Sequence, residues 1–212
     1  MEQTQIIQRI NYKPYKLEIA VEYFLDCAKY IFGQKIEITK DFEYIMINLI
    51  KWIHNDETCD FDLNKGIGLI GPTGTRKTFA MNCMQEYMKI DDVRYYRLQK
   101  LVTFNFKMFS SREICGEYQE NGYDAINKFS SYNIICIDDF GAEPEKTVHY
   151  GTTLNVIEAL IEERYLAEKL THFTSNLDEN SIREKYGERV YSRLKQKINF
   201  IKLEDKDFRI AG

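Results

Sequence analysis

The hydrophobic positions near the start of the chain predict two amphipathic helices. From residue 17 onward, apolar side chains recur at helical spacing up to Gly33, a natural helix end. Thr39 can cap a second helix, which opens with acidic residues and continues to Ile53. The pair is either a separate partner-binding module or packed on the main domain, the usual place of an apolar stripe. The stripes contain Leu17, Val21, Phe24, Ala28 and Ile31, then Phe42, Ile45, Met46, Leu49 and Ile53.

Beyond the polar stretch 55–64, short apolar runs alternate with helical segments, which predicts a parallel sheet covered by helices. The expected fold class is α/β, a three-layer α/β/α sandwich on a parallel central sheet. Residues 1–60 would form a small helical extension and residues 61–212 the main domain. Strands are expected at 66–70, 93–97, 133–138, 171–176 and 198–203. Helices are expected from Phe79 to the turn at 91–92, over 113–130 with a break near Gly122, from Leu154 to Tyr165, and on both sides of Gly187.

Composition narrows the functions that are open to this chain. Its net charge of −4 means that nucleic acid would have to bind a local patch. The five cysteines contain no C-x-x-C pair and the three histidines show no ligand spacing, so no disulfide framework or zinc site is predicted. The sequence shows neither a signal peptide nor an apolar run of membrane-spanning length, which predicts a cytoplasmic protein without membrane contact.

A glycine-rich stretch lies between the first expected strand and its helix, the position of a P-loop, which binds nucleotide phosphates. The pattern G-x-x-x-x-G-K-[ST] is met by Gly71, Lys77 and Thr78, but Arg76 stands where the second glycine belongs. Lys77 would be the cation at the β- and γ-phosphates, and Thr78 the hydroxyl ligand of the metal. The nucleotide-binding candidates are Gly71, Pro72, Thr73, Gly74, Thr75, Arg76, Lys77 and Thr78.

Polar residues follow two of the expected strands, where the sites of open α/β sheets gather. Asp138 ends one apolar strand, as a metal-binding carboxylate would, and Asp139 could polarise an attacking water. Asn176 ends another strand and could orient that water or the γ-phosphate. The alternative for all three is an ordinary turn after a strand, and for the aspartates it is the upstream P-loop that favours the site.

Two arginines, Arg189 and Arg193, are four residues apart and therefore share one face of the expected helix after Gly187. An arginine held at a subunit edge can reach the phosphate of a neighbouring subunit. The alternative is a solvated basic face in which Glu188 is the local ion-pair partner.

Together these motifs resemble the AAA+ ATPases of the helicase-loader and transposition-helper group, the DnaC-type and IstB-type proteins. The resemblance covers residues 66–209, most of the chain. It rests on the P-loop, on Ile-Ile-Cys-Ile-Asp-Asp-Phe-Gly as Walker B, on Thr-Ser-Asn as sensor 1 and on Gly-Glu-Arg-Val-Tyr-Ser-Arg-Leu. It implies an ATPase that binds ATP and Mg²⁺. Because the sequence stops at Gly212, we expect no separate C-terminal helical lid of the kind that many AAA+ proteins have.

The resemblance also implies a role for each matching residue. Asp138 would bind the magnesium, Asp139 would be the catalytic base and Asn176 sensor 1. Arg193 matches the arginine finger that acts in trans, and Arg209 resembles the sensor-2 arginine that contacts the nucleotide.

Proteins of this group assemble as homo-oligomers on DNA with a protein partner, so the resemblance implies single-stranded DNA and a replicative helicase or a transposase-type protein as partners. A single-strand site combines cations with stacking aromatics, and residues 94–109 contain both. These side chains either contact DNA or fill the core behind the second strand. They are Arg94, Tyr95, Tyr96, Arg97, Lys100, Phe104, Phe106, Lys107 and Phe109.

Arg76 is expected to lower the ATP-binding or ATPase activity of this chain. A phosphate loop needs glycine where its backbone takes a positive φ, which costs any other residue about 1–2 kcal/mol. We therefore expect poor binding or hydrolysis of ATP. The leading function is a DNA-associated ATPase that acts as a helicase loader or transposition helper. The alternative is a P-loop scaffold that recruits a partner through residues 17–55 without turnover. A small-molecule kinase would need a lid with clustered arginines, which the sequence does not show.

Overall fold

The computed structural model describes residues 9–10, 15–33, 38–91, 94–97 and 100–203. The chain divides into two compact units. The first unit takes in the described residues of 1–64, 74–105 and 203–212, and the second takes in 65–73 and 106–202. The first unit combines the N-terminal helices with the helix that follows the glycine-rich loop. The domain boundary predicted at residue 60 stays a prediction.

Three helices form the core of the first unit: α1 (Leu17–Phe32), α2 (Lys40–Ile53) and α3 (Lys77–Asp91). Thr39 caps α2 as predicted, because its hydroxyl accepts a hydrogen bond from Phe42 N at 3.2 Å. The ring of Phe24 on α1 lies 5.8 Å from that of Tyr87 on α3. The ring of Phe42 on α2 lies 5.7 Å from that of Phe79. The apolar stripes of the N-terminal helices are therefore packed against α3.

A small antiparallel sheet also belongs to the first unit. Its strands, in spatial order, are β1 (Arg9–Ile10), β3 (Arg94–Arg97) and β4 (Lys100–Thr103). The prediction that residues 93–97 form a strand of the main parallel sheet is wrong, because β3 pairs antiparallel with both neighbours. Its sequence, Arg-Tyr-Tyr-Arg, lacks the continuous apolar run of a strand that is buried on both faces.

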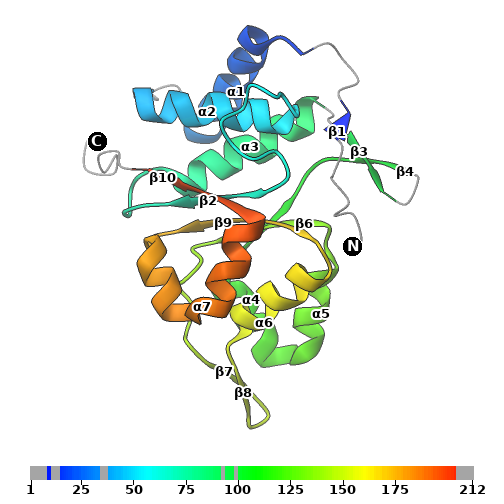
Figure 1. Ribbon diagram of the computed structural model, residues 1–212, viewed down its shortest axis with the longest axis vertical. Coiled ribbons are helices and arrows are strands. Elements are labelled where there is room, and N and C mark those ends of the chain that lie inside the picture. Colours follow the sequence, from blue (N-terminus) through cyan, green and yellow to red (C-terminus); the bar gives the residue numbers. More distant parts are fainter. Residues whose placement is uncertain (1–8, 11–14, 34–37, 92–93, 98–99, 204–212) are drawn as a thin grey trace. The chain divides into compact units, whose positions relative to one another are not determined.

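The second unit contains a five-stranded sheet in the order β10-β2-β9-β6-β5, in which every neighbouring pair is parallel (Figure 1). The strands predicted from residues 66, 133, 171 and 198 are confirmed. The edge strand β5 was not predicted, because its four residues include an exposed lysine and lead directly into a helix. The strands are β2 (Gly66–Ile70), β5 (Lys107–Ser110), β6 (Ile134–Asp138), β9 (Leu170–Ser175) and β10 (Ile198–Lys202).

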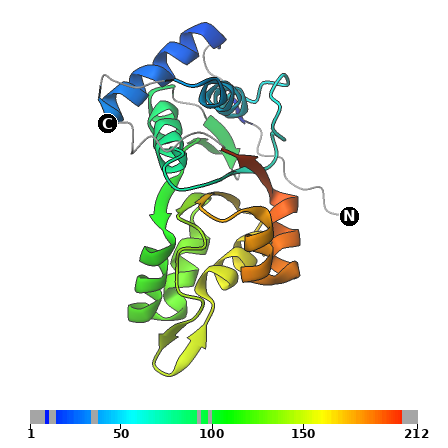
Figure 2. The ribbon, with the colours of Figure 1, turned by 90° about the vertical axis from the view of Figure 1, so that its left-hand side faces the viewer.

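One face of this sheet is covered by helices of the same unit, as Figures 1 and 2 show. They are α4 (Ser111–Asn121), α5 (Tyr123–Ser131), α6 (Val156–Leu166) and α7 (Glu179–Lys197). The predicted breaks are present, since Gly122 separates α4 from α5 with φ +58° and Gly187 interrupts α7 with φ +78°. The buried core between helices and sheet includes Phe129, Ile137, Leu160, Phe173 and Val190.

A hairpin of β7 (Thr147–His149) and β8 (Thr152–Leu154) precedes α6. Leu154 lies in this hairpin and not in the predicted helix, because Asn155 caps α6 by accepting a hydrogen bond from Glu158 N at 3.2 Å. None of the described helices combines the length and hydrophobicity that a membrane span requires.

Candidate functional site

The glycine-rich loop leaves β2 after Ile70 and enters α3 at Lys77. Within it, φ is +147° at Gly71, +89° at Gly74 and +63° at Arg76. A left-handed backbone costs a residue with a Cβ roughly 1–2 kcal/mol, so the position of Arg76 favours glycine. The condition on which the expectation about Arg76 depended, a positive φ, is therefore met.

Lys77 is the first residue of α3, and only 5% of it is exposed. Its Nζ donates a hydrogen bond to Oγ1 of the buried Thr75 at 3.3 Å, and the next residue, Thr78, is half-buried. The first turn of α3 contains no acidic residue. The lysine thus adds positive charge to the positive end of the helix dipole, an arrangement that favours a bound anion.

At the carboxyl edge of the parallel sheet, Thr174 joins the ends of β9 and β6. Its Oγ1 donates to Asp138 Oδ1 at 2.5 Å and accepts from Asp139 N at 3.0 Å. Thr174 is fully buried, whereas Asp138 is half-buried. The threonine therefore fixes both the Asp138 carboxylate and the backbone that follows it. From the sequence, Thr174 was named only as the first residue of the Thr-Ser-Asn motif, and the sensor-1 role was given to Asn176 alone.

Asp139 sits in a turn with φ +52°, and its side chain is exposed. Its carbonyl oxygen accepts hydrogen bonds from Ser111 Oγ at 2.8 Å and from Ala142 N at 2.9 Å. Asn176 follows the last residue of β9 directly and is also exposed. Because β6 and β9 are parallel neighbours, the structure places Asp138, Asp139 and Asn176 at the same edge of the sheet.

Arg189 and Arg193 share one carboxylate on α6. Glu162 Oε1 lies 3.1 Å from Arg189 Nε and 2.7 Å from Arg193 Nη1. The Arg193 guanidinium lies 5.0 Å from the centre of the Tyr165 ring, and its side chain is 17% exposed, against 72% for Arg189. Arg193 is therefore packed against α6, and its role as a finger stays a prediction.

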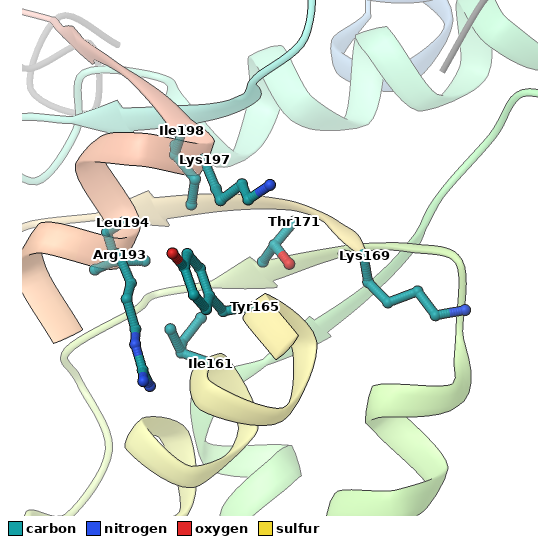
Figure 3. Close-up of a pocket in the computed structure, with 8 residues that line it drawn as sticks. All are labelled: Ile161, Tyr165, Lys169, Thr171, Arg193, Leu194, Lys197 and Ile198. Atoms are coloured by element: carbon teal, nitrogen blue, oxygen red, sulfur yellow. The ribbon is translucent and has the colours of Figure 1, made fainter. Parts of the chain in front are cut away.

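Arg193 lies at the opposite end of the sheet from Asp138 and Asn176. It lines a small pocket in which β9 and β10 begin, so the pocket belongs to the amino edge (Figure 3). Arg193 therefore does not share a site with the aspartates of its own unit. Glu188, the partner proposed for a basic face, pairs with Arg183 instead. The pocket is lined by Ile161, Tyr165, Lys169, Thr171, Arg193, Leu194, Lys197 and Ile198.

Solved structures share this architecture. The DnaC helicase loader matches with a TM-score of 0.60 and 14% identity, over 86% of this chain and 99% of that chain. DnaI matches with a TM-score of 0.57 and 14% identity, over 82% of this chain and 87% of that chain. The AMPPCP-bound DnaA from Aquifex aeolicus matches at 0.54 and 16% identity, over 82% of this chain and 50% of that chain. The chain has the fold of DnaC-type AAA+ proteins.

The expected fold class is thus confirmed: an AAA+ α/β fold with a parallel central sheet flanked by helices. No protein-family model and no curated protein matches the sequence. At these identities the likeness establishes the fold, and activity has to be argued from the residues.

The structure describes the expected DNA patch only in part, and it does not describe the expected sensor-2 arginine. Arg209, the expected sensor-2 arginine, lies outside the described residues. In the aromatic stretch, Phe104 and Phe106 are buried, with 0% and 4% exposed, and Phe109 packs against the hydrophobic core. These phenylalanines have the core role that was the alternative to DNA stacking. The remaining aromatics and two of the cations have side chains outside the described set, namely Tyr95, Tyr96, Arg97 and Lys100.

The two expected magnesium ligands, Thr78 and Asp138, each carry an oxygen donor of a kind that Mg²⁺ binds. No group of three or more His, Cys, Asp or Glu side chains that could hold a metal ion exists among the described residues. Mg²⁺ at a nucleotide needs fewer protein ligands, because it keeps water and phosphate oxygens and adds one or two from the protein. The Asp138 carboxylate at a strand end and the Thr78 hydroxyl at a helix start are donors of this kind.

Proposed function

We propose that this chain is an ATP-binding, DNA-associated AAA+ ATPase that acts as a helicase loader in DNA replication or as a transposition helper. The AAA+ fold supports this, since the solved neighbours include the DnaC helicase loader and an AMPPCP-bound DnaA. The proposal includes a cytoplasmic location, assembly as a homo-oligomer, single-stranded DNA, and a replicative helicase or transposase as protein partner.

The observation that carries the proposal is the charge at the start of α3. Lys77 is buried there, the first turn has no acidic residue, and the preceding loop supplies left-handed backbone at Gly71 and Gly74. Helix N-termini carry about half a positive charge and favour bound anions, and the ammonium of Lys77 adds to that charge. A triphosphate is the anion for which a glycine-rich loop, a lysine and a threonine are suited.

Hydrolysis would use residues at the carboxyl edge of the sheet. Asp139 would take the proton of the attacking water, Asn176 would orient that water, and Asp138 with Thr78 would hold Mg²⁺. The metal would neutralise charge on the phosphate oxygens. Arg193 would serve the nucleotide of a neighbouring subunit, which its place at the amino edge supports.

Arg76 would weaken this activity. Arg76 has a left-handed backbone, and its side chain makes it sterically unfavourable for the loop backbone to contact phosphate. Charge pairing between the guanidinium and phosphate offsets only part of this cost. This observation favours the second candidate, a P-loop scaffold that recruits a protein partner without turnover.

A titration with a fluorescent ATP analogue tests the proposal. Arg76→Gly should bind about tenfold more tightly than the unsubstituted chain, the equivalent of about 1.4 kcal/mol, and Lys77→Ala should lose binding. Glu168→Gly is the matched control, because Glu168 also has a positive φ, at +51°, but follows α6 at the other end of the sheet. Failure of both the unsubstituted chain and Arg76→Gly to bind would refute an ATP site.

Steady-state hydrolysis separates the two candidates. Turnover that collapses in Asp139→Asn while the nucleotide still binds would support the ATPase. No turnover in the unsubstituted chain or in Arg76→Gly, together with undiminished capture of a partner by Lys77→Ala, would support the scaffold. Equal affinity and turnover in the unsubstituted chain and Arg76→Gly would refute the proposal that Arg76 weakens ATP binding or hydrolysis.

A further inference from the structure

A buried carboxylate lies directly after the turn that carries Asp139. The Glu143 side chain is 1% exposed. Its Oε2 accepts a hydrogen bond from Gly141 N at 2.9 Å, and its Oε1 accepts one from the Tyr186 hydroxyl and lies 3.3 Å from Lys185 Nζ. Burying a carboxylate costs several kcal/mol unless it is paired and hydrogen-bonded, so these three donors make the burial of Glu143 possible.

The side chain of Lys185 also binds the backbone of this loop. Its Nζ donates to the carbonyl oxygens of Gly141 at 2.7 Å and of Glu143 at 2.9 Å. Burial, and after it the neighbouring Glu143 carboxylate, raise the pKa of Tyr186, so its hydroxyl remains the donor. Lys185 and Tyr186 both belong to α7, and the loop over residues 141–143 is therefore fastened to that helix.

We propose that Glu143, Lys185 and Tyr186 form a clamp that positions Asp139. The proposal rests on the proposed function, in which Asp139 is the catalytic base. Asp139 itself is left-handed, a conformation that persists only where the surrounding structure determines it. Thr174 holds this turn on its strand side, and the clamp holds the residues that follow. Without the clamp, the loop is free to relax and to carry the Asp139 carboxylate out of position.

The clamp makes a prediction that separates positioning from folding. Glu143→Gln keeps the shape of the side chain but loses its charge, and single-turnover hydrolysis should fall at least about tenfold, because small displacements of a reacting group cost up to about 10²-fold. The dissociation constant of the fluorescent ATP analogue should stay within about threefold, since the clamp does not touch nucleotide. Lys185→Met should behave alike, and Lys185→Arg should restore part of the rate.

Glu179→Gln is the matched control. Glu179 also lies on α7 and also accepts hydrogen bonds from a tyrosine and a lysine, Tyr191 at 2.8 Å and Lys195 at 2.9 Å. Its side chain is 37% exposed, and both of these donors lie on α7 rather than in the aspartate turn. Its substitution should leave hydrolysis and affinity unchanged.

The assay uses the full chain without substitution and with Arg76→Gly as a second parent, and circular dichroism checks each fold. Tyr186→Phe, which removes one donor, serves if Glu143→Gln does not fold. Unchanged hydrolysis in a folded Glu143→Gln or Tyr186→Phe chain, or a loss of affinity that equals the loss of rate, would overturn the clamp. Absence of hydrolysis in both parents would overturn the proposed ATPase itself, and with it the basis of the clamp.

Discussion

Replacing the buried Arg164 on α6 should destabilise the second unit strongly. Only 1% of Arg164 is exposed, and its guanidinium binds the segment that precedes β6 and the first two residues of β9. These strands end at Asp138 and Ser175, so Arg164 fixes the amino ends of the strands whose other ends carry the candidate site. Its acceptors are Phe129 O at 3.0 Å, Tyr132 O at 2.8 Å, Asn133 O at 3.4 Å, Leu170 O at 2.6 Å and Thr171 Oγ1 at 2.8 Å.

The size of the effect follows from these hydrogen bonds. Four of them are 3.0 Å or shorter, and Arg164→Met would remove all four from a largely buried site, at about 1 kcal/mol each. Two terms work the other way. Methionine regains apolar packing, and the desolvation of the guanidinium, which lowers the pKa of Arg164 to about 9, is no longer a cost. We expect a net loss of about 2–3 kcal/mol, which is a fall in melting temperature of about 4–12 °C.

Urea unfolding followed by far-UV circular dichroism measures this loss. Arg164→Lys keeps a charge but cannot reach all the acceptors, and should fall between methionine and the unsubstituted chain. Arg183→Met is the control, since Arg183 is 57% exposed and its ion pair with Glu188 lies at the surface. If Arg164→Met proved as stable as Arg183→Met, the reasoning about buried acceptors would be refuted.

Three further changes test separate features. Thr174→Val removes the hydroxyl that holds Asp139 N and should lower ATP hydrolysis, whereas Thr174→Ser should keep it; equal rates would contradict a role for that hydroxyl. Gly66→Ala would place a Cβ 1.9 Å from Thr171 O and should cost about 1–3 kcal/mol in urea unfolding, and a neutral result would show that the strand moves freely. Asp178 caps α7, and the hydrogen bond from a backbone N–H lowers the pKa of its carboxyl, so its stabilisation is present above the unfolded pKa and is lost as the pH falls through the lower, folded value. Asp178→Asn should flatten that acid loss in unfolding measured between about pH 5 and pH 2, and an unchanged pH profile would rule out this origin.

The local pattern of hydrophobic and polar residues was enough to predict most of the helices and strands. The buried strand β6 reads as an unbroken apolar run, and Gly122 and Gly187 break helices where they were expected. The failures occurred where pairing decides the outcome. The strand β3 has four residues, two of which are arginines. Its place in a separate antiparallel sheet depends on pairing with β4 and with β1, and β1 is far away in the sequence. No local periodicity contains that information.

In the candidate site, too, residues in short sequence motifs could be predicted, whereas contacts between residues far apart in the sequence could not. The residues of short motifs, Asp138 and Lys77, could be predicted because their neighbours in sequence are also their structural context. The clamp could not, because Glu143 and Lys185 are 42 residues apart and neither belongs to a recognisable pattern. Thr174 bonds to Asp138 across 36 residues. Such contacts exist only after β6 and β9 have paired and α7 has packed on them.

Arg76 and Asp139 share a left-handed backbone, with φ +63° and +52°, but the consequences differ. Aspartate tolerates this conformation better than most residues, and two hydrogen bonds hold its turn: Asp139 N donates to Thr174 Oγ1, and Ser111 Oγ donates to Asp139 O. Arginine has no such tolerance, and its side chain stands in a loop that phosphate would have to approach closely. The features that would position Asp139 are therefore present, and the effect proposed for Arg76 is on the binding of the nucleotide. Low affinity with competent hydrolysis of whatever binds is the behaviour that this combination implies, which is why affinity and rate have to be measured separately in the Arg76→Gly comparison.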